Sequence, residues 1–417
     1  MMMRYRFSKT IVATLMAAVF LSSCMAPPPR GANTQRAPQM ARDLAPGSST
    51  TISPYDSMTA NADEDAAIAN QKVVKVALLL PLTGRSAQLG RALQDAAAVS
   101  LFDKYARLSV SAQTVRVELL PKDTGDTPDQ AARAMSEAVA SGAEFAIGPL
   151  FADATSAAAP IARAKNISVL SLSNTRTQAS PGTYMFGFSP AEQTERVVSY
   201  AISNGRVKIA VLAPNSALGD AVTAAARETA EKQGVKLVAE AKYMLQGAGM
   251  DTALNNLVPA GKKPAFDAIL IPEGGAALDT IMRGLSARGV RPSTVKFLGT
   301  GLWDDADLLR RVNLESAWLA SSPPELTSQF EKRFLSTYKY APPRIASLSY
   351  DAVALAVTLA TSGRAFDATT LAAPAGFAGP ANGIFRLRAN GITQRGLAVM
   401  EVQGGNRKVI SPAPTGF

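Results

Sequence analysis

The chain has 417 residues, enough for two or three ordinary domains, and its 47% apolar and 18% charged residues are typical of a globular protein. It has no histidine and a single cysteine, which excludes histidine-based catalysis and metal binding, disulfides within the chain and cysteine zinc sites. The net charge of +10 comes without a basic cluster, so we expect no nucleic-acid partner, and we also expect no metal and no cofactor.

The first residues have the layout of a secretory signal. Arg4, Arg6 and Lys9 give a positive start, and residues 11–21 form an apolar run that only Thr14 interrupts. A membrane span needs about 20 apolar residues, so this run is too short to be one. The pattern therefore predicts a bacterial-style export signal.

The signal ends in Leu21-Ser22-Ser23-Cys24, which resembles the lipobox of bacterial lipoproteins. In that family the cysteine thiol is acylated and the cysteine becomes the new N-terminus. The resemblance implies a signal peptide over 1–24 and a lipid anchor on Cys24. Met25 follows, not an aspartate, and by the family's sorting logic this implies the periplasmic face of the outer membrane, with the inner membrane less favoured.

Residues 25–70 are rich in Pro, Ala, Ser, Thr and Asn and have no apolar periodicity. Such a segment cannot bury a core, so we expect a disordered tether. A chain of this length would span roughly 35–40 Å on average.

From Lys72 onward, strands are predicted to alternate with helices. The expected strands of the first half are 73–80, 115–120, 145–147 and 168–172, and the expected helices are 86–105, 127 to about 141, and 152–164. After residue 190 the rhythm resumes with helices at 191–204 and 276–288 and strands at 208–212, 235–243, 267–271 and 295–298. This alternation predicts an α/β fold of two doubly wound, Rossmann-like lobes with parallel sheets.

Ligands of such sheets bind beyond the carboxyl ends of the strands, so two facing rims would form a cleft. Hydroxyl, amide and glycine residues at these ends are the candidate ligand-binding residues, together with three apolar residues and one acid. They are Thr83, Gly84, Gly148, Pro149, Leu150, Ser171, Ser173, Asn174, Thr175, Leu218 and Glu273. The backbone amides of Gly84 and Gly148 could donate hydrogen bonds to a ligand carboxylate. Helix capping and turn formation are the alternative explanation for the polar residues among them.

Four motifs in order resemble the leucine/isoleucine/valine-binding protein family, which has the type I periplasmic binding protein fold. They are 75–84 with Leu89-Gly90, 146–150 with 159–162, 171–175, and 348–355. The resemblance covers about residues 72–417 and implies three crossovers between the lobes. It places lobe one at 71–190 plus 302–365 and lobe two at 191–301 plus 366–417.

The family's binders of free amino acids hold the ligand with groups that this chain lacks at three of four matching positions. Ala152 stands where a hydroxyl is expected, Ala277 where an acid meets the ammonium, and Leu218 where an aromatic wall is expected. Thr175 keeps the second hydroxyl, and Glu273 lies near Ala277. A buried ammonium without a counter-charge is unfavourable, so the usual amino-acid pose fits poorly.

The sequence is more similar to one subfamily, the outer-membrane lipoprotein activators of penicillin-binding proteins. The similar segments are 148–150, 188–190, 216–220, 266–269 and the tail from Ala381 through Asn390-Gly391 to Val409. Members can carry a helical-repeat N-terminal domain, whereas this chain has only the short tether there.

Three hypotheses for function follow. The first is a regulator that reaches from the outer membrane to a peptidoglycan synthase, a penicillin-binding protein. The second is a receptor that delivers amino acids or other small polar solutes to the permease of an ABC importer. The third is a carboxylate-based hydrolase using Asp123 with Asp126, or the run 304–307; capping and turn formation explain both acid clusters, so we expect no enzyme.

Overall fold

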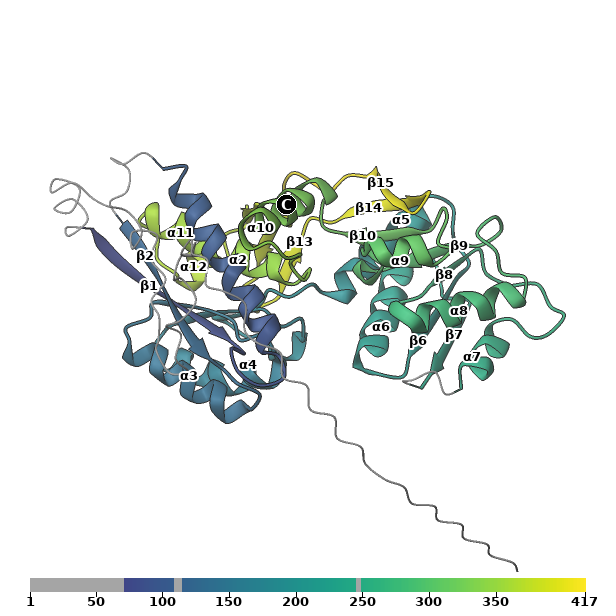
Figure 1. The fold of residues 1–417 in the computed structure, drawn as a ribbon. Coiled ribbons are helices and arrows are strands. Elements are labelled where there is room, and N and C mark those ends of the chain that lie inside the picture. The colour runs from purple at the N-terminus through teal and green to yellow at the C-terminus, as the bar shows by residue number, and fades with distance from the viewer. Residues whose placement is uncertain (1–70, 109–114, 245–248) are drawn as a thin grey trace, which may run out of the picture. The chain divides into compact units, whose positions relative to one another are not determined.

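The computed structural model describes residues 71–108, 115–244 and 249–417, which fold into two α/β lobes (Figure 1). Lobe one comprises residues 71–188 and 323–396, and lobe two comprises residues 189–322 and 397–417. The predicted signal peptide, the predicted lipidation site Cys24 and the predicted tether lie outside the described residues. Among the described helices, none combines the length and the apolar character needed to cross a bilayer.

Lobe one is built on a five-stranded parallel sheet in the order β2-β1-β3-β4-β5. Its strands are β1 (Lys72–Leu80), β2 (Val115–Asp123), β3 (Phe145–Ile147), β4 (Ser168–Ser171) and β5 (Thr183–Met185). Alternate residues of β1 contribute to cores on opposite faces, with Leu78 on one face and Leu79 on the other. Burial on both faces explains why β1 is an almost continuous apolar run.

Helices cover both faces of this sheet. The lobe-one helices are α2 (Ala87–Tyr105), α3 (Pro128–Ala140), α4 (Ala152–Arg163), α10 (Pro324–Tyr338), α11 (Ala346–Thr361) and α12 (Ala368–Leu371), with a 3-10 turn η2 (Arg176–Gln178). Helices α2 and α11 pack on one face and α3 and α4 on the other (Figure 1). The predicted start of α3 is confirmed by a capping box in which Thr127 and Gln130 satisfy each other's backbone amides.

Lobe two has a seven-stranded sheet in the order β15-β14-β10-β9-β8-β6-β7. Its strands are β6 (Ile209–Pro214), β7 (Ala239–Tyr243), β8 (Ala268–Leu270), β9 (Lys296–Gly299), β10 (Trp318–Ser321), β14 (Ala398–Gln403) and β15 (Asn406–Ser411). The strands from β6 to β10 are parallel, and β14 and β15 add an antiparallel edge.

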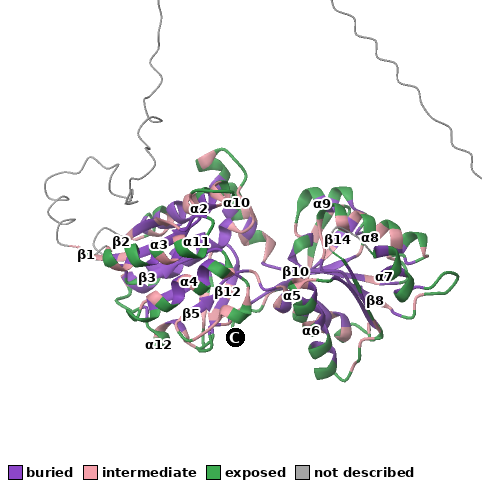
Figure 2. Cartoon of the chain, turned by 90° about the horizontal axis from the view of Figure 1, so that it is seen from below, coloured by how far each residue is buried: buried purple, intermediate pink, exposed green. Residues whose placement is uncertain are grey.

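Helices also cover both faces of the lobe-two sheet. They are α5 (Pro190–Ser203), α6 (Ala217–Lys232), α7 (Met250–Leu257), α8 (Gly275–Ala287) and α9 (Ala306–Arg311), with a 3-10 turn η4 (Gly301–Trp303). Helices α5 and α6 share one core, and α7, α8 and α9 share the other. Figure 2 shows buried residues along the strands and exposed residues on the outer sides of the helices.

The predicted fold class, two doubly wound lobes, is confirmed, but the lobe boundaries after residue 301 are wrong. Strand β10, expected in lobe one, hydrogen-bonds to β9 and β14 in lobe two. The small antiparallel sheet of β11 (Phe377–Gly379), β12 (Gly383–Leu387) and β13 (Thr393–Arg395) was expected in lobe two. It lies in lobe one, because Phe385 and Leu387 pack into the core beneath α11.

Candidate functional site

A cavity of about 630 Å³ lies at the carboxyl-end rim of the lobe-one sheet. Three loops line it, those that follow β1, β2 and β3 and lead into α2, α3 and α4. The lining residues are Arg85, Ser86, Gly125, Asp126, Thr127, Phe151, Ala152, Asp153 and Ala154. The volume is within the range of small-molecule sites, and the rim is where open α/β sheets bind ligands.

Two carboxylates line this cavity, and one phenyl ring forms an apolar wall. Asp126 accepts a hydrogen bond from the Arg85 amide at 2.9 Å, and Asp153 accepts one from the Ala154 amide at 2.8 Å. Phe151 is 39% exposed, which is unusual for a large aromatic side chain in a folded lobe. The Arg85 side chain is 92% exposed, and its Nε lies 3.9 Å from the Asp126 carboxylate, so the lining carries one cation beside its two acids.

In the first turn of α4, Asp153 accepts from the Ala154 amide, while the N-cap residue caps no amide with its side chain. That residue is Phe151, which has no side-chain hydrogen-bond acceptor, and the N-cap of α2, Ser86, makes no capping bond either. An uncapped helix start presents N–H groups and the positive end of the helix dipole. The cavity therefore combines donors suited to a carboxylate with acids suited to an amino group.

The loop after β1 differs from the prediction. Asp123 accepts hydrogen bonds from the Leu82 and Thr83 amides, from the Thr83 hydroxyl at 2.5 Å and from the Gly125 amide. Burial alone would raise the pKa of Asp123, but these hydrogen bonds to the carboxylate lower it. Gly84 has φ +79°, and a Cβ there would lie 2.1 Å from a carboxylate oxygen of Asp126. The Leu82, Thr83 and Arg85 amides of this loop are thus used by the lobe's own acids.

The predicted residues at the end of β3 are structural. Gly148 donates its amide to the Leu170 carbonyl oxygen at 2.9 Å, so it is not free for a ligand carboxylate as expected. Gly148 has φ +92°, and a Cβ would lie 2.1 Å from the Leu79 carbonyl oxygen, so only glycine fits there. The Pro149 carbonyl oxygen accepts from the Leu172 amide, and Leu150 is buried in the core of lobe one.

The hydroxyls after β4 are engaged inside the lobe in the same way. Ser171 is fully buried and lies 2.7 Å from the Thr155 hydroxyl, and the Ser173 hydroxyl accepts from the Thr175 amide. Asn174 is exposed and donates to the Phe188 carbonyl oxygen. The Thr175 hydroxyl makes no side-chain cap on η2. Turn formation therefore accounts for most of this set.

The two predicted residues of lobe two also have internal partners. Leu218, in the first turn of α6, packs against the core shared by α5 and α6. The Glu273 carboxylate accepts from the Tyr243 hydroxyl at 2.5 Å and from the Gly274 amide at 3.1 Å, while Trp303 donates its ring N–H to the Glu273 carbonyl oxygen. Burial, followed by the bond to Glu273, raises the pKa of Tyr243.

The acids of the hydrolase hypothesis after β9 are also structural. Asp304 accepts from the Ser321 hydroxyl at 2.6 Å and forms an ion pair with Arg407. Asp305 caps α9, and Asp307 pairs with Arg310 on that helix. Among the described residues there is also no group of three or more acids or cysteines arranged to hold a metal ion.

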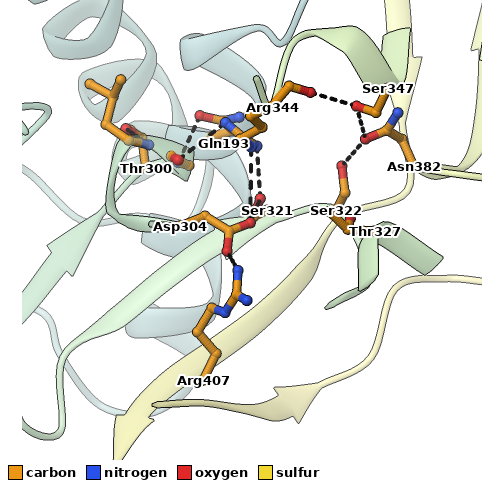
Figure 3. A network of polar contacts seen from close by, with 12 residues as sticks. Gln193, Thr300, Asp304, Ser321, Ser322, Thr327, Arg344, Ser347, Asn382 and Arg407 are labelled. Carbon is orange, nitrogen blue, oxygen red and sulfur yellow. Dashed lines mark hydrogen bonds and ion pairs between the residues drawn. The ribbon is translucent and has the colours of Figure 1, made fainter. Parts of the chain in front are cut away.

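A polar network lies where the chain passes between the lobes (Figure 3). Arg344, two residues before α11, donates to the Gly301 carbonyl oxygen at 3.1 Å and to the Ser321 hydroxyl at 2.8 Å. Gln193 of α5 accepts from the Gly301 amide at 2.9 Å. Asn382 accepts from the hydroxyls of Ser322 and Ser347 (Figure 3). The network thus ties lobe one to lobe two.

Sequence reasoning missed the buried charges of this region. Arg395 is only 6% exposed, and burial lowers its pKa to about 10; Asp351 is fully buried, and burial raises its pKa to about 6. Their one local signal is a charged residue inside an otherwise apolar segment, as with Asp351 in 346–361. That signal does not reveal the partner, because the partners are 30 or more residues away.

Comparison with known proteins places most of the chain in one protein family. The family model described as "periplasmic binding protein" matches residues 73–407. "Uncharacterized protein RP748" of Rickettsia prowazekii is 28% identical over 130 residues, which are 31% of this chain and 33% of that protein. The chain therefore matches only about a third of the length of this curated relative.

Several solved structures share the fold. A putative branched-chain amino acid ABC transporter protein from Rhodospirillum rubrum has a TM-score of 0.71 and 22% identity, covering 81% of this chain and all of that one. A Rhodopseudomonas palustris solute-binding protein in complex with 3,4-dihydroxybenzoic acid has a TM-score of 0.59 and 23% identity, covering 83% of this chain and 97% of that one. An isoleucine complex of a Streptococcus pneumoniae branched-chain amino acid binding protein has a TM-score of 0.58 and 19% identity, covering 82% and 100%.

Proposed function

Because this chain belongs to the periplasmic binding protein family, we propose that it is a receptor for a small solute carrying both an amino group and a carboxylate, which it delivers to an ABC importer. Residues 73–407 form a solute-binding domain of that family, and the chain is a binding protein and not an enzyme. The cavity at the lobe-one rim is the observation that carries the proposal.

The lining of the cavity defines the solute class. The uncapped start of α4 stabilises a carboxylate, and Asp126 and Asp153 attract an ammonium group. Phe151 supplies an apolar surface for the body of the solute. Lobe one would then hold the ammonium group of the solute. An acid at position 277 of lobe two is not needed in that case, and Glu273 can stay bonded to Tyr243.

The test is a thermal-shift screen with free amino acids, short peptides, peptidoglycan fragments and hydroxybenzoates. A ligand at 100 times its Kd adds about 2.7 kcal/mol to the free energy of unfolding, a shift of a few degrees. We expect amino acids or peptides to shift the melting temperature, and Asp126→Asn with Asp153→Asn to abolish that shift. The control is Asp129→Asn, an exposed acid of α3 outside the cavity lining. A shift by hydroxybenzoates alone, unaffected by the double variant, would refute the solute class.

A second candidate function is regulation of a penicillin-binding protein by an outer-membrane lipoprotein. Two features favour this function, because both weaken a site for small solutes. Position 152 is an alanine and has no hydroxyl, and the backbone amides that follow β1 donate to Asp123. It is supported if no solute shifts the melting temperature and the purified protein forms a complex with a peptidoglycan synthase. It is rejected if a solute binds and no such complex forms.

A further inference from the structure

Four loops lead into the parallel strands of lobe two, and they are rich in positive charge. They are residues 204–208 before β6, 233–238 before β7, 258–267 before β8 and 288–295 before β9. Together they contain one acid, Asp267, and seven cations: Arg206, Lys208, Lys236, Lys262, Lys263, Arg288 and Arg291. The longest run among them is Lys262-Lys263, so the sequence itself shows no basic cluster.

The lobe-two sheet brings these loops to one edge. Strands β7, β6, β8 and β9 are neighbours in that order and run parallel, so their amino ends lie side by side. The Val238 amide donates to the Ile209 carbonyl oxygen at 2.9 Å, and the Lys296 amide donates to the Asp267 carbonyl oxygen at 2.9 Å. Neighbouring strands are about 4.8 Å apart, so the four strand starts span only about 15 Å. We call the surface formed by the four loops the basic edge.

Most of the charge on the basic edge is not neutralised within the lobe. Arg288 pairs with Asp251 at 3.5 Å, whereas the other six cations form no ion pair with a described residue. Among those six, Arg206 is half-buried and the other five are exposed. The one acid of the loops, Asp267, accepts a hydrogen bond from the Lys208 backbone amide at 3.1 Å. The basic edge therefore presents an excess of positive charge to the solvent.

The ends of helices do not by themselves explain this excess. The four loops follow the carboxyl ends of α5, α6, α7 and α8, where cations are favourable. The corresponding segments of lobe one, 106–114, 141–144 and 164–167, also follow helix ends. They contain only Arg107 and Lys165, against the acid Glu144. The excess is thus a property of lobe two.

Two exposed valines lie among the cations of the basic edge. Val207 stands between Arg206 and Lys208 and is 47% exposed, and Val238 is 46% exposed. Because the Val238 amide is bonded to Ile209, the two valines lie at adjacent strand starts. A soluble polyanion needs only cations for binding, whereas a membrane surface binds cations through its headgroups and apolar side chains between them. This combination of side chains favours a membrane.

We propose that the basic edge of lobe two docks onto the surface of a membrane that contains anionic phospholipids. The cations would contact the lipid phosphates, and the two valines would lie between the headgroups. The basic edge is at the amino ends of the strands, opposite to the rim where sheets of this kind bind solutes, so docking leaves that rim of lobe two open. The proposal requires neither a solute in the lobe-one cavity nor acylation of Cys24, so it stands or fails separately from both.

The experiment is vesicle flotation with the chain from Met25 onward. This chain lacks the predicted signal and Cys24, and it keeps all the described sheets and cores. The vesicles contain phosphatidylethanolamine with about 30% phosphatidylglycerol, and vesicles of phosphatidylcholine are the neutral reference. We expect binding to the anionic vesicles at about 0.05 M salt, much weaker binding to the neutral vesicles, and loss of most binding at about 0.5 M salt. Equal binding to both kinds of vesicle, or to neither, would overturn the proposal.

A triple variant, Lys236→Gln with Lys262→Gln and Lys263→Gln, removes three exposed cations of the basic edge. Each cation near an anionic surface contributes about fivefold to affinity, so this variant should bind the anionic vesicles about 100-fold more weakly. The matched control has the same net charge but removes exposed cations of lobe one, by Arg133→Gln, Lys165→Gln and Lys332→Gln. It should bind nearly as well as the parent chain. An equal loss in the two triple variants would show that net charge alone attracts the chain, which would refute the proposed surface.

The double variant Val207→Ser with Val238→Ser distinguishes a membrane from a soluble polyanion. Removal of the two apolar side chains should weaken vesicle binding by about tenfold and leave binding to heparin unchanged. Thermal melts of each variant check that the changes, all at exposed positions, leave the fold intact. Binding to heparin without binding to vesicles would replace the membrane with an anionic polymer. Vesicle binding that the valine variant leaves unchanged would also count against the membrane as the partner.

Discussion

At the carboxyl end of β1, the lobe's own acids occupy amides that a ligand might use. Asp123 bridges two loops by accepting from Leu82, Thr83 and Gly125, and Asp126 holds the Arg85 amide. The residue types around these acids predicted turns, which was correct. Their spacing could not reveal that Asp123 crosses from one loop to another, because that contact joins positions 41 residues apart.

Asp123→Asn tests this bridging at the level of one residue. The folded-state pKa of Asp123 lies below its ordinary value of 3.8, so its contribution to stability is present above about pH 4 and is lost as the pH falls through the folded-state pKa. We expect the variant to lose about 1–2 kcal/mol at pH 7 and to lose less on acidification than the parent chain. Urea unfolding at pH 7 and pH 3 measures both; Glu231→Gln, an exposed acid in α6, should change neither.

Gly301→Ala tests the network in Figure 3. A Cβ at Gly301 would lie 2.6 Å from Nη2 of Arg344 and 2.9 Å from Nε2 of Gln193, so both side chains must move. We expect a loss of about 1–3 kcal/mol in the free energy of unfolding. Gly274→Ala is the matched control, since its Cβ would meet only Leu302 at 3.5 Å or more. Equal unfolding midpoints for the two variants would contradict a structural role for this contact.

At the scale of elements, the sequence predicted β1, α2, α3, β3 and α4 within one or two residues. Their apolar runs and capping residues are local signals, and both faces of the sheet are buried, so little competes with them. Strand β10 and the sheet of β11 to β13 were placed in the wrong lobe. Their lobe is decided by pairing with β9 and β14 and by packing under α11, and these contacts leave no local pattern.

Phe151→Ser separates stability from binding at the start of α4. A serine at the N-cap can accept a backbone N–H of the first turn, which should raise the free energy of unfolding by about 0.5–1 kcal/mol. The same change removes the apolar wall and uses a donor of the cavity, so the ligand-induced melting shift should fall. Thermal melts with and without ligand give both quantities. A variant that is more stable and binds the ligand equally well would place the solute elsewhere.

At the scale of the whole molecule, four motifs at strand ends were enough to predict the two-lobed fold, whereas most of the candidate site residues have partners inside their own lobe. Ser171, Gly148 and Leu218 lie at the expected rims, but each is engaged inside its own lobe. The sheet topology places a residue at the end of a strand. Whether its side chain faces the cavity or the interior of the lobe depends on contacts with residues that are distant in sequence. Asp153 and Phe151 were therefore not predicted as site residues, although they adjoin Ala152, which was considered.

The predicted membrane anchor is a property of the whole chain, and the prediction depends on Cys24. If the thiol is acylated, Cys24→Ala removes the acylation site, and the protein should move from the membrane fraction to the soluble periplasmic fraction. Met25→Asp keeps the thiol and, by the sorting logic of lipoproteins, should move the protein from the outer to the inner membrane. Fractionation followed by immunoblotting measures both. Since acylation needs a thiol, membrane retention of a Cys24→Ala protein from which residues 1–23 have been removed would mean attachment by another route, and the lipobox interpretation would then be wrong.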